Sequence, residues 1–196
     1  MIDSVTYLRE QKERRITLND FVSAYYNCDI LQVTPDLHDF LLDIVYLTIQ
    51  MNGKLPYKGR INEYGNHLEE VMLRALQEKY KEQIIVEKLG SGYPDLRLQY
   101  GEIMIYPELK ISKKIDDINT FRVFYTSTPK ESTKKRKAIV DGYHILFHFE
   151  HDGPGKLSKK YRVTDLNGFE YTALGNIQQG SYKDLYEIHD KIILEG

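Results

Sequence analysis

The stretch Gly92-Tyr93-Pro94-Asp95, followed by Leu96 to Tyr100, Gly101 and Glu102 to Ser112, predicts a β-hairpin around which the rest of the chain is organised. Its second arm contains Pro107-Glu108-Leu109-Lys110. The hairpin therefore places two carboxylates and one ammonium on neighbouring strands.

Side chains alternate between the two faces of a strand, so the second arm divides into two sets. If Tyr100 and Gly101 form a two-residue turn, Gln99 lies opposite Glu102, and Asp95 lies opposite Tyr106. We therefore expect Asp95, Glu108 and Lys110 to meet on one face. That face also carries Glu102, Met104 and Tyr106, and the other carries Ile103, Ile105, Pro107, Leu109 and Ile111.

Two carboxylates a few ångströms apart suit Mg²⁺, which keeps several waters and takes one or two carboxylates plus a phosphate. Lys110 is no ligand while charged, but its ammonium could orient a water or stabilise negative charge on a phosphate. The alternative is a solvated hairpin face, where charged residues are common.

A helix is predicted from Asn62 onward, with an apolar stripe that includes Leu68, Met72 and Leu76. At 100° per residue Glu69 falls inside the apolar sector, whereas Glu70 lies with Arg74 on the polar side. A buried carboxylate needs a partner, and a metal site on the packed sheet would supply one. Alternatively, Glu69 packs its stem and extends its carboxylate to water.

Pro94-Asp95, a short gap and then Glu108-Leu109-Lys110 resemble the PD-(D/E)xK motif of the restriction-endonuclease-like nuclease superfamily. Gly65-Asn66-His67-Leu68-Glu69 resembles the Gly-x-x-x-Glu helix that often precedes this hairpin. The resemblance covers about Asn62 to Glu150. It implies an α/β or α+β fold with a mixed β-sheet flanked by helices, which the order of predicted elements also favours.

The mechanism implied by the resemblance is Mg²⁺-dependent phosphodiester hydrolysis. Asp95 and Glu108 would hold the metal with the Leu109 carbonyl and a DNA phosphate oxygen, and Lys110 would orient or help deprotonate the attacking water. Glu69 would join a second ion or its water shell.

A small chain without a helicase or ATPase segment looks most like a type II restriction endonuclease, which usually acts as a homodimer on a short site in double-stranded DNA. Two alternatives remain. One is a structure-selective repair or junction-resolving nuclease of the same fold, and the other is a DNA-binding module that has lost the chemistry.

Composition sets outer limits on the protein. The 196 residues are 41% hydrophobic, enough for one domain of ordinary size, and 27 Lys plus Arg against 29 Asp plus Glu do not indicate a polyanion partner. The single cysteine, Cys28, excludes an internal disulfide and a Cys-based zinc site. With no apolar run long enough for a membrane span, we expect a soluble protein of the reducing cytoplasm.

One nuclease domain is predicted over 1–196, with an N-terminal helical segment at 1–55, a catalytic core at 56–165, and a polar loop and C-terminal helix at 166–196. In the first segment, Thr17 begins one helix, and Thr34-Pro35-Asp36 begins a second that ends near Asn52-Gly53. Pro35-Asp36 is a second Pro-Asp pair, but helix capping explains it and we assign it no catalysis. The segment is a possible dimer or DNA-contact element.

A strand is predicted at 143–149, with His144 and His148 on one face. The two are roughly 13 Å apart along a strand, too far to share one ion, so we interpret them as one solvated or groove-facing side.

Other residues are candidates for DNA contact. Basic clusters are either solvated loops or contacts to the phosphate backbone, and amide side chains can pair with adenine. The basic candidates are Lys113, Lys114, Lys130, Lys134, Lys135, Arg136 and Lys137, and the amide candidates are Asn176, Gln178 and Gln179.

Overall fold

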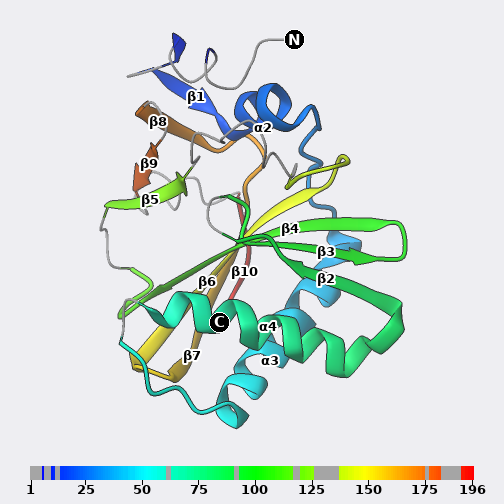
Figure 1. Ribbon diagram of the computed structural model, residues 1–196, viewed down its shortest axis with the longest axis vertical. Coiled ribbons are helices and arrows are strands. Elements are labelled where there is room, and N and C mark those ends of the chain that lie inside the picture. The colour runs from blue at the N-terminus through cyan, green and yellow to red at the C-terminus, as the bar shows by residue number, and fades with distance from the viewer. Residues whose placement is uncertain are drawn as a thin grey trace.

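The computed structural model describes residues 6, 10–11, 14–60, 63–90, 93–116, 120–125, 137–174, 177–181 and 191–196. They form a large mixed β-sheet, a small antiparallel sheet and the helices that cover them (Figure 1). The predicted α+β class with a mixed sheet flanked by helices is confirmed.

The large sheet has six strands in the order β10-β7-β6-β4-β3-β2. Strands β4 and β6 are parallel, and every other neighbouring pair is antiparallel. The central strand β6 is buried from His144 to Phe149, as expected where both faces of a strand are covered. The bounds are β2 Ile84–Lys88, β3 Leu96–Tyr100, β4 Ile103–Ser112, β6 Tyr143–Gly153, β7 Lys156–Asp165 and β10 Ile192–Glu195.

The small sheet lies beside α2 at the upper end of the view in Figure 1, with the strand order β1-β8-β9-β5. Its strands are β1 Arg15–Thr17, β5 Thr120–Tyr125, β8 Glu170–Leu174 and β9 Ile177–Ser181. The prediction of a polar loop after residue 166 is therefore wrong. The glutamines of β9 suggested a loop, but this segment is a strand that pairs with β8 on one side and with β5 on the other.

The predicted C-terminal helix is also wrong where the structure describes it. Residues 192–195 form β10, which pairs antiparallel with β7, and residues 182–190 lie outside the described part of the chain. The run Ile192-Ile193-Leu194 contains β-branched residues that favour a strand once an open sheet edge is available.

The first helix begins where the sequence predicts, and the next two begin a few residues later than predicted. Helix α2 (Leu18–Tyr26) begins with a capping box between Thr17 and Asp20. Pro35–Leu37 form a 3-10 turn, η1, before α3 (His38–Lys54), and α4 (Tyr64–Tyr80) leads into β2 through the 3-10 turn η3 (Lys81–Gln83). The N-terminal segment differs from the prediction in one respect, because it also contributes the strand β1.

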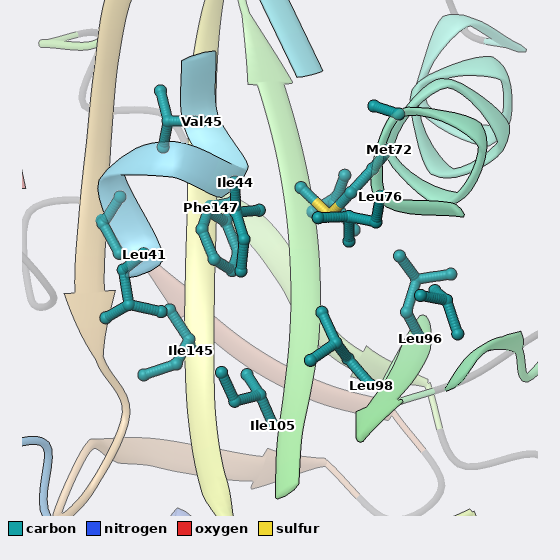
Figure 2. Close-up of a cluster of buried hydrophobic side chains, with 14 of the residues drawn as sticks. Leu41, Ile44, Val45, Met72, Leu76, Leu96, Leu98, Ile105, Ile145 and Phe147 are labelled. Carbon is teal, nitrogen blue, oxygen red and sulfur yellow. The ribbon is translucent and has the colours of Figure 1, made fainter. Parts of the chain in front are cut away.

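Helices α3 and α4 lie together on one face of the large sheet, and their apolar side chains pack against it (Figure 2). A second cluster packs on the other face and includes residues of α2, β1 and β8. On β4, Ile105 and Leu109 belong to the first cluster, and Met104 and Tyr106 belong to the second. This division confirms the predicted alternation along β4. The residues labelled in Figure 2 are Leu41, Ile44, Val45, Met72, Leu76, Leu96, Leu98, Ile105, Ile145 and Phe147.

The hairpin register differs from the predicted one. Tyr100 pairs with Ile103, so the turn residues are Gly101 and Glu102, and Gly101 has a φ of 58°. Continued to its open end, this register places Asp95 opposite Glu108 rather than Tyr106. Because partners shift by two residues, every side chain keeps the face that was predicted for it.

Candidate active site

Asp95 and the second arm of the hairpin are joined directly. The Leu109 amide donates a hydrogen bond to Asp95 Oδ2 at 2.8 Å. The Asp95 carbonyl accepts from the Leu89 amide at 3.0 Å, which ties the end of β2 to the start of β3. These two bonds hold the Asp95 carboxylate beside the Glu108-Leu109-Lys110 segment.

Lys110 lies within the same group. Its ammonium donates to Glu108 Oε1 and, at 3.2 Å, to the Leu109 carbonyl oxygen. The three residues that the sequence placed on one face therefore meet at one end of the hairpin.

Glu108 is the most buried carboxylate of this group, with 4% of its surface exposed. Burial, together with the negative charge of Asp95, raises its pKa to about 8, against the opposing effect of Lys110. Glu108 Oε2 is buried and has no hydrogen-bond partner among the described residues. Burying a carboxylate oxygen without a partner costs free energy, so this oxygen is a candidate to bind a further ligand.

Glu69 is buried on α4, as predicted, and Glu70 is only half-buried, with a carboxylate that accepts from Arg74 Nε at 2.7 Å. The partner of Glu69 is Lys88 on β2, with Nζ 2.8 Å from Oε2. Burial raises the pKa of Glu69, Lys88 opposes that rise, and the charges of Asp95 and Lys110 also act on it. Glu69 therefore interacts electrostatically with Asp95 and Lys110 of the hairpin site while it forms an ion pair with Lys88.

Lys137 is a residue of this site that sequence reasoning assigned only to a basic cluster. Its ammonium donates to the carbonyl oxygens of Gly90 at 3.0 Å and Pro94 at 3.1 Å. Burial lowers its pKa, and the charges of Asp95, Glu108 and Glu69 oppose that shift. No local pattern links Lys137 to the hairpin, because the link is a tertiary contact between distant parts of the chain.

The interpretation of His144 and His148 as a solvated side is wrong, because both are fully buried. Burial lowers the pKa of each to about 3, so both are neutral. His144 Nδ1 contacts the Tyr93 hydroxyl, and His148 Nε2 lies 2.7 Å from Ser112 Oγ. Their strand packs between two layers, which the alternation of polar and apolar residues did not reveal.

Of the predicted DNA contacts, Lys113 and Lys114 line a cavity of about 580 Å³ that also includes Glu150, Asp152 and Lys160. Gln178 and Gln179 lie on β9, and their side chains are outside the described part. Lys130, Lys134, Lys135, Arg136 and Asn176 lie outside the described residues.

The donor set fits a hard divalent cation such as Mg²⁺. Asp95 and Glu108 supply two carboxylates, Glu108 Oε2 has no protein partner in the described part of the chain, and the Leu109 carbonyl is adjacent. Within that part no group of three or more His, Cys, Asp or Glu side chains could hold a metal. An ion here would complete its coordination with water and phosphate oxygens.

No helix within the described residues is long and apolar enough to cross a membrane. In comparisons with known proteins, the model of the Type II restriction enzyme MjaV family matches residues 11–189. No curated protein and no solved structure matches the chain. The match spans nearly the whole chain and contains Glu69, Asp95, Glu108, Lys110 and Lys137, so the protein belongs to the Type II restriction enzyme MjaV family.

Proposed function

We propose that this protein is an Mg²⁺-dependent type II site-specific deoxyribonuclease, which hydrolyses phosphodiester bonds of double-stranded DNA within a short sequence. The observation that carries the proposal is the meeting of Asp95, Glu108 and Lys110 at one end of the hairpin, with Glu108 Oε2 buried and without a partner among the described residues. Membership of a restriction enzyme family supports the choice of DNA as substrate.

The residues that would hold Mg²⁺ are Asp95 and Glu108, with the Leu109 carbonyl oxygen as a third ligand. When bound, such an ion polarises a phosphate oxygen and offsets the charge that develops on the phosphate. The bond from the Leu109 amide to Asp95 Oδ2 leaves Oδ1 as the oxygen of Asp95 that is free of this constraint and able to face an ion.

Lys110 acts at the other side of Glu108. A charged ammonium donates hydrogen bonds only, so its role is to orient the attacking water and to stabilise negative charge on the phosphate. Its bond to Glu108 Oε1 holds the side chain near the carboxylates. Glu69 adds negative charge from α4 and would join the water shell of the bound ion, or of a second ion.

DNA contact would come from the basic candidates. Lys113 and Lys114 follow β4 directly, at a cavity where charges of both signs gather. Phosphate contacts of this kind steer DNA without reading its sequence. Base reading by Asn176, Gln178 and Gln179, and further phosphate contacts by Lys130, Lys134, Lys135 and Arg136, remain proposals, as does a homodimer that cuts both strands.

The test is a plasmid digest with the purified protein in Mg²⁺ and in EDTA. We expect discrete fragments with constant ends in Mg²⁺ only, and loss of cleavage in Asp95→Ala and Lys110→Ala. Sequencing the ends gives the recognised site and the cut position, and sedimentation with and without DNA gives the oligomeric state.

Two outcomes would select another function. Cleavage of branched or damaged DNA alone would indicate a structure-selective nuclease. DNA binding without metal-dependent cleavage would indicate a binding module. Wild-type cleavage rates in Asp95→Ala would remove the basis for placing the site at the hairpin.

A further inference from the structure

Lys137 spans the connection between β2 and β3, where Asp95 lies. The two carbonyl oxygens that its ammonium contacts, those of Gly90 and Pro94, come before Asp95 in this connection. One side chain therefore bridges the end of β2 and the residue directly preceding Asp95. Loss of this bridge would leave the Leu89 and Leu109 amides as the described backbone contacts of Asp95.

The main chain around Lys137 is itself held firmly against β4. Ala138 is fully buried, and the amides of Ile139 and Val140 donate to the Tyr106 hydroxyl at 3.1 and 3.3 Å. The Tyr106 hydroxyl in turn donates to the Val140 carbonyl at 2.8 Å. Tyr106 lies two residues before Glu108 on the same face of the strand, so Lys137 is anchored to the strand that carries the second carboxylate.

An ammonium in this position contributes charge as well as hydrogen bonds. Asp95, Glu108 and Glu69 are the negative groups that act on Lys137. When all three are deprotonated, the carboxylates of this partly buried site repel one another, and a cation among them lowers the cost of that arrangement. A neutral donor could satisfy the two carbonyls, but it would not offset the charge.

We propose that Lys137 is a positioning residue of the nuclease site, which fixes the connection carrying Asp95 and places a second positive charge, beside that of Lys110, among the three carboxylates. The inference rests on the proposed function. Lys137 acts through Asp95 and Glu108, so its removal changes turnover more than DNA binding.

The test compares Lys137→Met, which keeps an apolar stem, with Lys137→Gln, which keeps an amide donor, and Lys137→Arg, which keeps the charge. Lys54→Met is the matched control. Lys54 is exposed at the end of α3, and its ion-pair partner is Glu78, which is not part of the hairpin. We expect kcat to fall about 10- to 100-fold in Lys137→Met and Lys137→Gln, with KM for DNA within about threefold of wild type. Lys137→Arg recovers most of kcat, and Lys54→Met behaves as wild type.

A second readout is independent of catalysis. Hydrogen exchange of the metal-free protein reports the Leu89 amide, which donates to the Asp95 carbonyl, and we expect it to exchange faster in Lys137→Met than in wild type or Lys54→Met. Wild-type kcat in either Lys137→Met or Lys137→Gln would overturn the inference, as would unchanged exchange at Leu89. A wild-type protein that does not cleave DNA, together with faster exchange in Lys137→Met, would instead refute the proposed function. The role of Lys137 in fixing the connection before Asp95 would then still stand.

Discussion

The Leu109 amide donates to Asp95 Oδ2 at 2.8 Å, across the open end of the β3-β4 hairpin. This bond links the Pro-Asp pair to the Glu-x-Lys segment without any ligand. The position of the Asp95 carboxylate is therefore set by a main-chain amide, and a substitution at Asp95 can remove its charge while keeping this hydrogen bond.

Asp95→Asn removes the charge of Asp95 and keeps an oxygen that accepts from the Leu109 amide. We expect the free energy of unfolding to change by less than about 1 kcal/mol, because the hydrogen bond is retained. Cleavage should fall on the order of 10²–10³-fold, because charge stabilisation at the phosphate is lost. Thermal melts and a plasmid assay measure the two effects.

The control for this change is Asp36→Asn, in the second Pro-Asp pair. Asp36 lies at the start of η1, exposed, and its side chain has no part in the hairpin site. We expect full activity. Equal losses in Asp36→Asn and Asp95→Asn would mean that the hairpin is not the site.

Glu108 makes the metal-free protein less stable as pH rises. The folded protein holds the Glu108 proton up to about pH 8, whereas the unfolded chain loses it near the ordinary pKa of 4.5. Between these values the folded state binds more protons, so the free energy of unfolding falls with rising pH and levels off above about 8. The loss is on the order of a few kcal/mol.

Glu108→Gln removes this titration. In EDTA, the urea concentration at the unfolding midpoint should fall less for the variant than for wild type between pH 5 and pH 9, because the variant lacks the titrating carboxyl. The variant should be more stable than wild type at pH 9 and inactive in cleavage. Parallel curves for the two proteins across this range would contradict a raised pKa at Glu108.

The hairpin, its faces and the inward position of Glu69 were predictable because they rest on local periodicity. Alternation along β4 and the 100° step along α4 each decide a direction from neighbouring residues alone. The turn was misplaced by one residue, although a glycine at the first central position is typical of a type II′ turn and favours Gly101-Glu102. Side-chain direction survived that error because the pairing shifted by an even number of residues.

What the sequence did not reveal depends on contacts between distant segments. Lys137 lies among basic residues that look like a solvated run, and only the folded chain brings it to Gly90 and Pro94. The burial of His144 follows from the layer that covers β6, and the strand β9 follows from partners on both sides. Neither the layer over β6 nor the partner strands of β9 can be inferred from the residues of these strands alone.

Glu69→Gln tests whether the α4 carboxylate supports the metal site from a distance. Glu69 pairs with Lys88 and acts electrostatically on the hairpin group, so its loss should weaken divalent metal binding about 10- to 100-fold. High Mg²⁺ should restore much of the cleavage, unlike the case of Asp95→Asn. Calorimetric titration with Ca²⁺ measures the affinity without turnover.

Glu70→Gln is the neighbouring control, since Glu70 is on the exposed side of α4 and bonds to Arg74. Its metal affinity should match that of wild type. Identical affinities in Glu69→Gln and Glu70→Gln would show that Glu69 is a structural partner of Lys88 alone.

The contact between Tyr93 and His144 makes the last prediction, because both side chains are buried beneath the site. Burial lowers the pKa of His144 to about 3 and raises the pKa of Tyr93, so the contact joins two neutral polar groups. Tyr93→Phe leaves His144 Nδ1 buried without its hydroxyl partner, and we expect a loss of about 1–3 kcal/mol in the free energy of unfolding. Tyr57→Phe also removes a tyrosine hydrogen bond, to the Arg60 carbonyl, but that bond is exposed, and its loss should cost less than about 0.5 kcal/mol.

Replacing both buried partners, in Tyr93→Phe with His144→Leu, should cost less than the sum of the single changes, because neither polar group is then left alone. Strict additivity in that double-mutant cycle, measured by urea unfolding, would mean that the hydroxyl and the imidazole do not stabilise one another.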